Sequence, residues 1–419
     1  MYRAPRGTND ILPADQSYWR MVEKVAAELS RLYGYQRIDT PVFEDASLFV
    51  RTVGEGTDIV EKETYTFEDR GNNRLTLRPE GTAPVCRAYI EHGMASLPQP
   101  IKLYYFAPIF RYDRPQAGRY REHHQFGCEA LGDLDPALDA EVIGLAWELY
   151  RRLGLQEISL QLNSIGHPGC RPAYLQKLVE HYRAHVQSIC ADCKVRLEKN
   201  PLRLLDCKEP GCQHIANAAP TMAGYLCAEC REHLEGVQSN LEALGIPFQM
   251  NHRLVRGFDY YTKTVFEFWP PQEGAQSTIG AGGRYDGLIE ALGGRPTPGV
   301  GFATGIERLI INLKAQGVEA PTIGGVQVFV GYKGAEAKKA AFTLTAELRE
   351  AGVAAVLSTG DRSLKAQMRH ADALGARYAL ILGSKELAEG TVTLRDMARA
   401  EQRSVPRGEV AQELLRLLA

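Results

Sequence analysis

The sequence has almost no net charge and no long apolar run. Its 49 Lys and Arg residues nearly balance 51 Asp and Glu residues, which excludes a histone-like polycation and a highly charged disordered chain. No stretch approaches 18 consecutive apolar residues, so we expect no transmembrane helix. Residues 1–6 are basic but lack the apolar stretch of a signal peptide, and we therefore expect a cytoplasmic protein.

Two common nucleotide-binding motifs are also missing. The sequence contains no GxxxxGK[ST] segment, which excludes a P-loop. The segment GVGFATG (299–305) is similar to a dinucleotide-binding loop, but its spacing differs and it follows a Gly- and Pro-rich turn instead of a strand. The context that such a loop requires is therefore absent.

The composition is that of a globular protein with several domains. Hydrophobic residues make up 44% of the 419 residues and charged residues 24%, which provides enough apolar material for a large core. A chain of this length is expected to form two or three domains.

The order of apolar patterns predicts three regions. Residues 1–170 and 249–320 contain runs of strands with helices between them, which favours an α+β fold with an antiparallel sheet flanked by helices. Residues 171–248 are helical and polar, and we interpret them as an inserted subdomain. After a Pro- and Gly-containing joint, strands and helices alternate over residues 326–419, which predicts a separate α/β domain.

The last region differs slightly in charge from the rest. Residues 326–419 contain 14 Lys and Arg residues against 11 Asp and Glu residues, whereas the remainder of the chain has an acidic excess. A basic module on an acidic body is compatible with contact to nucleic acid, although three charges are weak support.

Arginines cluster after the apolar strand IKLYYFAPIF. Arg111 ends this strand, and Arg114, Arg119 and Arg121 follow in the loop. Guanidinium groups on a loop between two strands can bind phosphate through paired hydrogen bonds. A solvated hairpin tip is the alternative.

Other charged and polar residues recur at predicted strand ends. Gln125 and Glu129 are four residues apart on the returning strand and therefore share one face. Glu80 closes another strand, Arg256 precedes an aromatic run, and Arg308 lies in a helix with a Gly-rich start. Any of these charges alone could form a structural salt bridge, but together they indicate a polar small-molecule site.

Six of the nine cysteines lie between residues 190 and 230. Cys190 and Cys193 form one CxxC pair, and Cys227 and Cys230 form another. Two such pairs can supply four thiolates to a structural zinc ion. The alternative is a set of unligated thiols, and the spacing does not decide between them. Cys86, Cys128 and Cys170 stand alone, and Cys207, Cys212 and His214 lie between the pairs.

Several segments together resemble one family. YGYQRIDTPVFED, FRYDRPQAGRYREHHQFGCE and GVGFATGIERL are similar to motifs 1, 2 and 3 of class II aminoacyl-tRNA synthetases. RGTNDILP, LVRGFDYYTKTVFE and AGGRYDGL are similar to signatures of the histidyl-tRNA synthetase family. The resemblance covers the chain from end to end.

The resemblance implies an ATP-dependent ligase. Members of this family join L-histidine to ATP, with Mg²⁺ accompanying the triphosphate, and pass the histidyl group from the adenylate to the 3′ end of tRNA. It also implies a homodimer, in which motif 1 with Pro41 lies at the interface, and a C-terminal anticodon-binding domain. Zinc is not needed for this chemistry.

The resemblance further implies residue roles. Arg111 and Arg256 would be catalytic, because they grip the α-phosphate and the histidine carboxylate, and Arg119 and Arg308 would bind ATP. The residues implied to bind histidine are Glu80, Gly81, Thr82, Arg111, Gln125, Glu129, Arg256, Tyr260 and Tyr261. Glu129 and Tyr261 would bracket the two imidazole nitrogens. Asp113 departs from the family pattern, which has Glu there, and we do not expect it to bind ATP directly.

Two other functions compete with this interpretation. A catalytically inactive paralogue that regulates histidine biosynthesis shares the fold, but it lacks the C-terminal domain and an intact set of histidine signatures. A synthetase for another amino acid would have to account for Glu129, Tyr261 and the GGRYDGL turn. Histidine-dependent ATP–pyrophosphate exchange distinguishes these functions.

Overall fold

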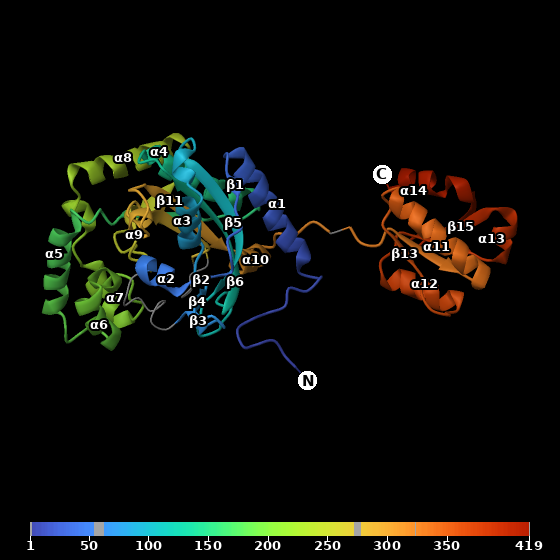
Figure 1. The fold of residues 1–419 in the computed structure, drawn as a ribbon, viewed down its shortest axis with the longest axis horizontal. Coiled ribbons are helices and arrows are strands. Elements are labelled where there is room, and N and C mark those ends of the chain that lie inside the picture. The colour runs from blue at the N-terminus through green and yellow to red at the C-terminus, as the bar shows by residue number, and fades with distance from the viewer. Residues whose placement is uncertain (1, 54–62, 272–277, 323, 419) are drawn as a thin grey trace. The chain divides into compact units, whose positions relative to one another are not determined.

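A computed structural model describes residues 2–53, 63–271, 278–322 and 324–418 (Figure 1). The chain divides into two compact units, Met1–Pro321 and Thr322–Ala419. The ranges predicted for the catalytic core and the C-terminal domain include Met1, residues 54–62 and 272–277, and Ala419, which lie outside the described residues. Among the described residues, no helix has the length and apolar character needed to cross a membrane.

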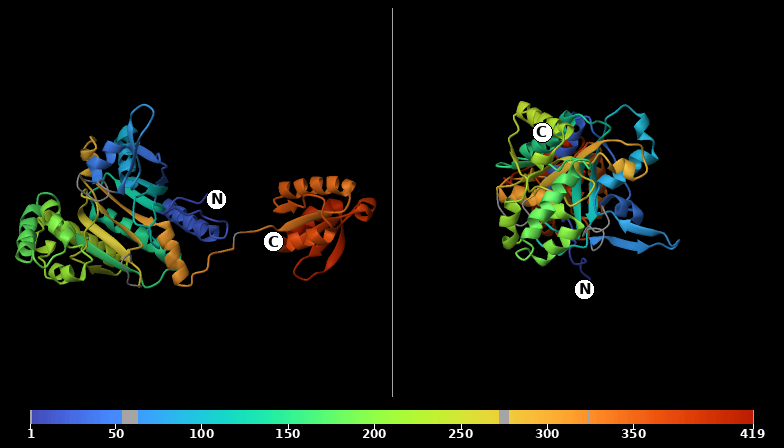
Figure 2. Two further views of the ribbon diagram at one scale, coloured as in Figure 1. Left: turned by 90° about the horizontal axis from the view of Figure 1, so that it is seen from below. Right: turned by 90° about the vertical axis from the view of Figure 1, so that its left-hand side faces the viewer.

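The first unit is built on an eight-stranded sheet (Figures 1 and 2). Its strand order is β1-β5-β6-β11-β10-β9-β7-β8. The strands are β1 (Gln36–Arg37), β5 (Ile101–Phe110), β6 (Glu122–Leu131), β7 (Ser159–Ser164), β8 (Phe248–Met250), β9 (Thr262–Trp269), β10 (Gly280–Arg284) and β11 (Gly299–Gly305). The central pairings are antiparallel, and the outermost pairs β1·β5 and β7·β8 are parallel. The predicted antiparallel sheet is therefore confirmed.

Helices α4 (Pro136–Arg152) and α10 (Ile306–Ala315) pack against this sheet, and α1 (Gln16–Leu32) packs against both of these helices. Helix α4 begins at a cap, because Asp135 accepts a hydrogen bond from the backbone N–H of Ala137 at 2.8 Å and Pro136 occupies the first turn. Its face toward the core buries Val142, Ile143 and Leu149 completely. This apolar layer supports one side of the sheet.

A small sheet lies beside the large one. It has the order β2-β4-β3 and consists of β2 (Phe43–Asp45), β3 (Tyr65–Glu68) and β4 (Arg74–Leu77). Helices α2 (Ala46–Val53), α3 (Thr82–Glu91) and α9 (Leu288–Ala291) contact one another next to it. The loop from β4 to α3 carries Glu80 and reaches the edge of the site described below.

The segment between β7 and β8 is helical, as its composition predicts. It contains α5 (Arg171–Ala184), α6 (Ala191–Lys199), α7 (Pro210–Asn217) and α8 (Ala228–Ala243). Of these four helices, α8 packs extensively against the long helix α4. The division into two units leaves this segment within the first one.

The second unit has its own five-stranded sheet and its own core. The strand order is β13-β12-β14-β15-β16, with β12 (Val328–Tyr332), β13 (Ala355–Leu357), β14 (Tyr378–Leu382), β15 (Thr391–Asp396) and β16 (Gln402–Pro406). The helices are α11 (Ala335–Glu350), α12 (Leu364–Ala373), α13 (Ser384–Glu389) and α14 (Val410–Leu418). Strand β16 has mostly exposed side chains, and α13 is a short helix of six residues.

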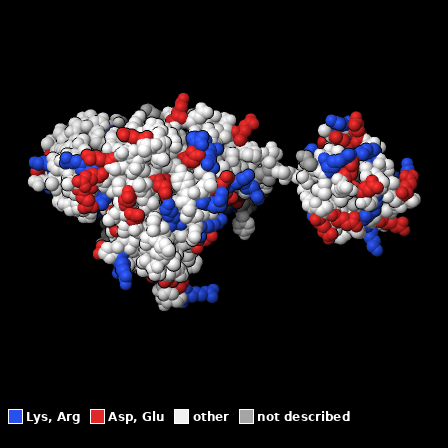
Figure 3. Space-filling view, turned by 90° about the horizontal axis from the view of Figure 1, so that it is seen from above, with Lys and Arg blue, Asp and Glu red and all other residues white. Residues whose placement is uncertain are grey.

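The basic excess of this unit is not gathered into one area on the face that Figure 3 shows. Lys and Arg side chains lie there beside Asp and Glu side chains. In this unit, Arg403 pairs with Glu413 and Arg407 pairs with Glu347 in exposed or half-exposed ion pairs. Net charge alone therefore does not identify a binding face in this unit.

Candidate active site

A cavity of about 470 Å³ lies over the central strands of the large sheet. Strands β5, β6, β9, β10 and β11 contribute to its walls, together with the β5–β6 loop, the segment before β9 and the start of α10. The predicted site residues that line it are Glu80, Gly81, Thr82, Arg111, Arg119, Gln125, Arg256, Tyr260, Tyr261 and Arg308. The remaining one, Glu129, lies buried behind the wall.

Arg111 is fixed at the end of β5. Its Nε donates a 2.8 Å hydrogen bond to the carbonyl oxygen of Pro79, and its guanidinium carbon lies 5.6 Å from the ring centroid of Phe258. Burial lowers its pKa, but an arginine stays charged in proteins. The side chain is therefore a cation held in a fixed orientation at the cavity wall.

Arg256 lies in the segment before β9 and forms an ion pair with Glu267 at 2.5 Å. Glu267 also accepts 2.8 Å hydrogen bonds from Trp269 Nε1 and Thr278 Oγ1. The sequence analysis missed Glu267. It could have been found as the single carboxylate within the apolar strand TKTVFEFW, because a buried charge there needs a partner.

Arg308 reaches the loop that carries Arg119, and both side chains line the cavity. Arg308 donates hydrogen bonds to the carbonyl oxygens of Thr278 at 2.7 Å and Gly118 at 3.0 Å. Arg119 forms an ion pair with Asp113. Asp113 therefore orients an arginine in this structure, and it is itself part of the cavity wall.

Neighbouring arginines affect the pKa of two basic groups in the cavity wall. Burial lowers the pKa of Arg308, and the charges of Arg119 and Arg111 lower it further. Burial also lowers the pKa of His123 to about 3, and the nearby Arg111 and Arg308 act in the same direction. Cations concentrated in a cleft attract anionic ligands.

Glu129 has an unusual environment for a carboxylate. It is 1% exposed, and burial raises its pKa to about 8. Its oxygens accept hydrogen bonds from the hydroxyls of Tyr285, of Thr82 at 2.8 Å and of Tyr105 at 3.3 Å. These three donors oppose the rise in its pKa, because they favour the charged form.

Tyr285 and Tyr105 are functional candidates that the sequence analysis did not assign. Tyr285 lies in the GGRYDGL turn. Because this turn is one of the segments that resemble the family, its position in the sequence could have identified it as a candidate. Tyr105 lies on β5, where its register opposite Gly127 gives its ring room beside β6.

The absence of a side chain at position 301 makes room for Glu129. Gly301 pairs with Glu129 across β11 and β6, and a Cβ atom at position 301 would collide with Glu129 Oε2. This strand therefore approaches the carboxylate with its bare backbone.

Glu80 and Thr82 form the start of helix α3. The carboxylate of Glu80 accepts hydrogen bonds from the backbone N–H groups of Thr82 at 2.6 Å and Ala83 at 2.8 Å. Burial raises the pKa of Glu80, and these two bonds oppose that shift. A negative charge at this helix N-terminus is electrostatically favourable.

Tyr260 and Tyr261 belong to an aromatic group in the cavity. Their ring centroids lie 4.7 Å apart, and the ring of Tyr261 lies 5.7 Å from the guanidinium carbon of Arg256. The tyrosine hydroxyls that donate to Glu129 are those of Tyr285 and Tyr105. That Glu129 and Tyr261 bracket an imidazole remains a prediction.

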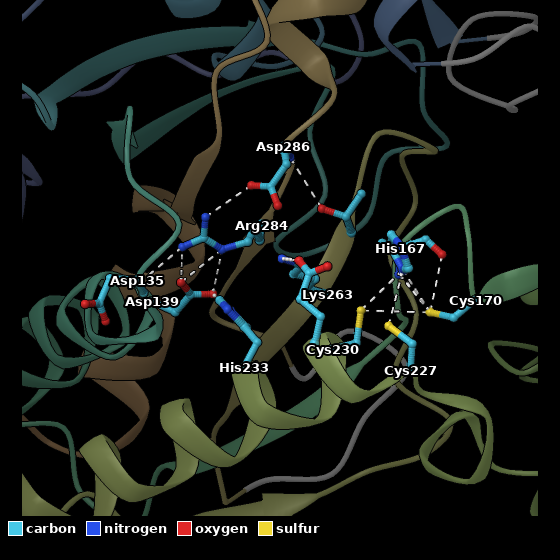
Figure 4. Close-up of polar contacts among 12 residues, drawn as sticks. Asp135, Asp139, His167, Cys170, Cys227, Cys230, His233, Lys263, Arg284 and Asp286 are labelled. Atoms are coloured by element: carbon cyan, nitrogen blue, oxygen red, sulfur yellow. Dashed lines mark hydrogen bonds and ion pairs between the residues drawn. The ribbon is translucent and has the colours of Figure 1, made fainter.

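Arg284 of the same GGRYDGL turn serves the fold and not the cavity. It is fully buried and forms ion pairs with Asp139 of α4 and, at 3.1 Å, with Asp286 (Figure 4). His233 of α8 contacts the same Asp139 at 3.2 Å. Buried charges of this kind need their partners, because an unpaired one costs several kcal/mol, on the order of 3–5.

The cysteines are grouped differently from the prediction. Cys190 and Cys193 lie with Cys207 and Cys212, whereas Cys227 and Cys230 lie with His167 and Cys170. The predicted single zinc site of Cys190, Cys193, Cys227 and Cys230 is therefore wrong. The physical reason is that each CxxC pair begins a different helix, α6 or α8, and each helix start faces a different part of the chain.

Comparisons with known proteins agree with one another. Residues 7–309 match the family model described as histidyl-tRNA synthetase, and residues 327–417 match an anticodon-binding domain. A histidine–tRNA ligase of Dehalococcoides mccartyi is 58% identical over 99% of both chains, and one of Moorella thermoacetica is 54% identical over 96% of this chain and 95% of its own. The crystal structure of apo Staphylococcus aureus histidyl-tRNA synthetase superposes with a TM-score of 0.83 at 38% identity, covering 99% of this chain and 100% of its own.

Proposed function

Because the chain belongs to the histidyl-tRNA synthetase family, we propose that the cavity over its large sheet is where histidine and ATP react. The protein activates L-histidine with ATP to histidyl-adenylate and transfers the histidyl group to the 3′ end of its cognate tRNA. What the proposal adds is the assignment of residues to these steps.

The observation that carries the assignment is the convergence of four guanidinium groups on one cavity, those of Arg111, Arg119, Arg256 and Arg308. In the first step the histidine carboxylate attacks the α-phosphate of ATP and pyrophosphate leaves in line. Negative charge then develops on the phosphoryl oxygens, and fixed cations stabilise it without reorganising. We assign Arg111 and Arg256 to the α-phosphate and the histidine carboxylate.

The other two arginines fit the rest of ATP. Arg119 lies on the β5–β6 loop and would hold the distal phosphates, while Arg308 approaches from α10 on the other side. Mg²⁺ would enter with the triphosphate and neutralise part of its charge. The adenylate remains bound until tRNA accepts the histidyl group.

Histidine would be recognised by the groups around Glu129. Thr82, Gln125 and Glu80 are placed at the wall for the α-ammonium group, and Glu129 with the neighbouring tyrosines would hydrogen-bond the imidazole. A site that pairs both ring nitrogens leaves buried polar groups unpaired with any other amino acid. Such sites discriminate by about 10⁴-fold or more, so no editing step is needed.

The exposed apolar residues of the small sheet support a homodimer. Phe43 and Phe67 are 51% and 43% exposed, and their rings contact each other edge to face. Phe43 belongs to the motif 1 segment, where the family pattern places the subunit interface, and Phe67 lies on β3 of the same small sheet. The tRNA substrate, which is shared with the ribosome, supports a cytoplasmic location.

The test of the proposed function is ATP–pyrophosphate exchange with each amino acid in turn. We expect exchange that depends on histidine and Mg²⁺. No exchange by the folded protein would support the inactive regulatory paralogue, and exchange driven by another amino acid would redirect the substrate assignment.

A truncation tests the tRNA part of the function. A chain that ends at Pro321 retains the first unit, since the second unit has a separate core. We expect histidine-dependent exchange within about twofold of the full chain and a loss of about 100-fold in kcat/KM for tRNA charging, because anticodon contacts are removed. Equal loss of both activities would contradict the assignment of histidine activation to the first unit and of anticodon contacts to the second.

A further inference from the structure

Two groups of metal-binding side chains lie in the segment around helices α5 to α8. The all-cysteine cluster consists of Cys190, Cys193, Cys207 and Cys212. The histidine-containing cluster consists of His167, Cys170, Cys227 and Cys230. In each cluster, the four ligand atoms all lie within 4.8 Å of one another.

The distances in the histidine-containing cluster match those of a tetrahedral metal site. The Sγ atoms of Cys170 and Cys230 are 3.9 Å apart. His167 Nδ1 lies 3.1 Å from the Sγ of Cys170, 3.4 Å from that of Cys230 and 3.9 Å from that of Cys227. A tetrahedron with Zn–S bonds of about 2.3 Å places its sulfur atoms about 3.8 Å apart.

The all-cysteine cluster has the same dimensions. The Sγ atoms of Cys190 and Cys207 are 3.8 Å apart, far beyond the disulfide bond length of about 2.05 Å. All nine cysteines are free. Four thiols held at this separation are too far apart to be bonded and close enough to share one ion.

Backbone N–H groups point at the sulfur atoms of both clusters. Cys193 N–H donates to Cys190 Sγ at 3.4 Å, and Cys190 N–H donates to Cys212 Sγ at 3.2 Å. In the other cluster, His167 N–H donates to Cys170 Sγ at 3.3 Å. Such donors stabilise thiolate charge and orient metal ligands.

We propose that each cluster binds one structural Zn²⁺. Thiolate and imidazole are the ligands that zinc prefers, and four protein ligands leave no open position for catalysis. The metal would therefore hold the fold together without reacting.

The histidine-containing site would join the two ends of the helical segment. His167 and Cys170 precede α5, while Cys227 and Cys230 begin α8 (Figure 4). An ion bound by both ligand pairs would crosslink residues 167–170 to residues 227–230 and so close the chain between them into a loop. In the unfolded chain this crosslink is absent, so the free energy of binding contributes to folding.

This site also contacts the wall of the cavity. Glu229, which lies between its two α8 cysteines, pairs with Lys263 at 2.7 Å, and the backbone N–H of Lys263 donates to the carbonyl oxygen of Gly166 at 2.8 Å. Arg171, next to Cys170, donates to the carbonyl oxygen of Tyr261. The metal would thus help to position the segment that carries Tyr261.

The all-cysteine site would hold the part of the segment that covers the cavity. Cys207 stands between Asp206 and Lys208, which both line the cavity. Asn200, at the end of α6, donates to Asp259 Oδ1 at 2.8 Å. The effect of both metals on catalysis rests on the proposed function, but metal binding itself does not.

Metal analysis of the full chain tests the proposal. The protein is produced with zinc in the medium, dialysed against metal-free buffer without a chelator and measured by inductively coupled plasma mass spectrometry. We expect two zinc ions per chain. Less than about 0.2 metal per chain, or iron in place of zinc, would overturn the assignment.

Two double variants separate the sites. C190S/C193S and C227S/C230S should each lose one zinc and retain the other, whereas C128A, a cysteine outside both clusters, should retain two. If either double variant lost all zinc, the two-site assignment would be wrong. Circular dichroism checks that each variant is folded.

A measurement on the unaltered chain covers the case in which a variant fails to fold. X-ray absorption at the zinc edge should report seven sulfur ligands and one nitrogen ligand shared by two metals. Oxygen-dominated coordination would overturn the proposal. Because exchange activity is measured separately, failure of the proposed function would not be mistaken for failure of this inference.

Discussion

The large sheet and the helical segment between β7 and β8 arrange their polar side chains by different means. In the sheet, the register between neighbouring strands places Glu129 opposite Gly301 and Leu103. In the helical segment, α6 and α7 have only nine and eight residues, and helices shorter than about 12 residues are marginal in isolation. There, groups of thiols and a histidine connect the helix ends.

With the proposed zinc ions bound, the first unit would combine two sources of order. A strand ladder fixes side chains through many backbone hydrogen bonds, and its failure is cooperative. A metal crosslink fixes a few positions, and its loss can be local. We therefore expect changes in the sheet to affect chemistry and changes in the clusters to affect local order.

The largest effect is expected from Arg256→Ala in the sheet cavity. The change removes a fixed cation from the developing charge, and we expect the rate of histidyl-adenylate formation to fall by about 10³-fold while histidine binding stays measurable. Single-turnover kinetics and histidine titration measure the two quantities.

The matched control is Arg152→Ala, which removes an arginine from a surface ion pair with Glu148. It should leave the rate unchanged. Because Arg256→Ala also leaves Glu267 without this ion pair, thermal unfolding and zinc content should be compared as well. A near-normal single-turnover rate in folded Arg256→Ala would refute the assigned role.

A second change tests the helical segment between β7 and β8. In C190S/C193S, amide exchange in α6 and α7 should accelerate by about 100-fold, since local opening no longer has to break a metal site. Amides of β5 and β6 should keep their protection. Equal acceleration in both regions would show that the clusters and the sheet unfold together.

Glu129→Gln tests the carboxylate behind the cavity wall. The variant retains the shape but replaces one carboxyl oxygen by an amide NH₂ group, and we expect the KM for histidine to rise by about 10- to 100-fold with a smaller change in KM for ATP. Equal changes in both constants would contradict a role in histidine recognition.

The same residue predicts a pH dependence of stability. The pKa of Glu129 rises from 4.5 to about 8 in the folded chain, so its contribution to stability is complete below the lower value and is lost as the pH rises through the higher one. Between about pH 5 and about pH 9, the Tm of the unaltered protein should fall more than that of Glu129→Gln, by about 2–4 °C. Calorimetry measures the difference, and a larger fall in the variant would contradict the assigned burial effect.

The smallest effect is expected where the two regions touch. Glu229→Gln removes the charge that pairs with the buried Lys263 (6% exposed) but keeps an amide oxygen that can accept its hydrogen bond, so the free energy of unfolding should fall by about 1 kcal/mol. Both zinc ions should remain bound. Denaturant unfolding measures the stability, and metal analysis measures the zinc content. A loss of zinc in this variant would contradict the expectation that the metal ligands hold the ion without the Glu229–Lys263 ion pair.

The sequence predicted the sheet region better than the helical one. Alternation along β6 predicts that Gln125 and Glu129 share one face, because strand periodicity is a local property. Gln125 lines the cavity, and Glu129 accepts a hydrogen bond from Thr82 in its wall. Tyr285 was missed as the partner of Glu129, since the contact joins residues far apart in the chain. Local patterns do not report such contacts.

The proposed metal ligands show the same limit more clearly. The two CxxC pairs have the same spacing, and this similarity led to the prediction that they share one zinc ion. The actual partners are the HPGC turn, where His167 and Cys170 already have the two-residue gap of a ligand pair, and the more widely spaced Cys207 and Cys212. The packing of the helices decides which ligand pairs lie together, and the spacing of the cysteines in the sequence does not determine this packing.

Gly301 has a consequence for any attempt to change the amino acid that the cavity accepts. The wall at this point is only a strand backbone in contact with the Glu129 carboxylate, so it offers no side chain to shorten and no space to fill. Every substitution there displaces the carboxylate first. Room for a larger substrate would have to be made on the aromatic side, at Tyr260 or Tyr261, where the cavity is bounded by groups that can be trimmed.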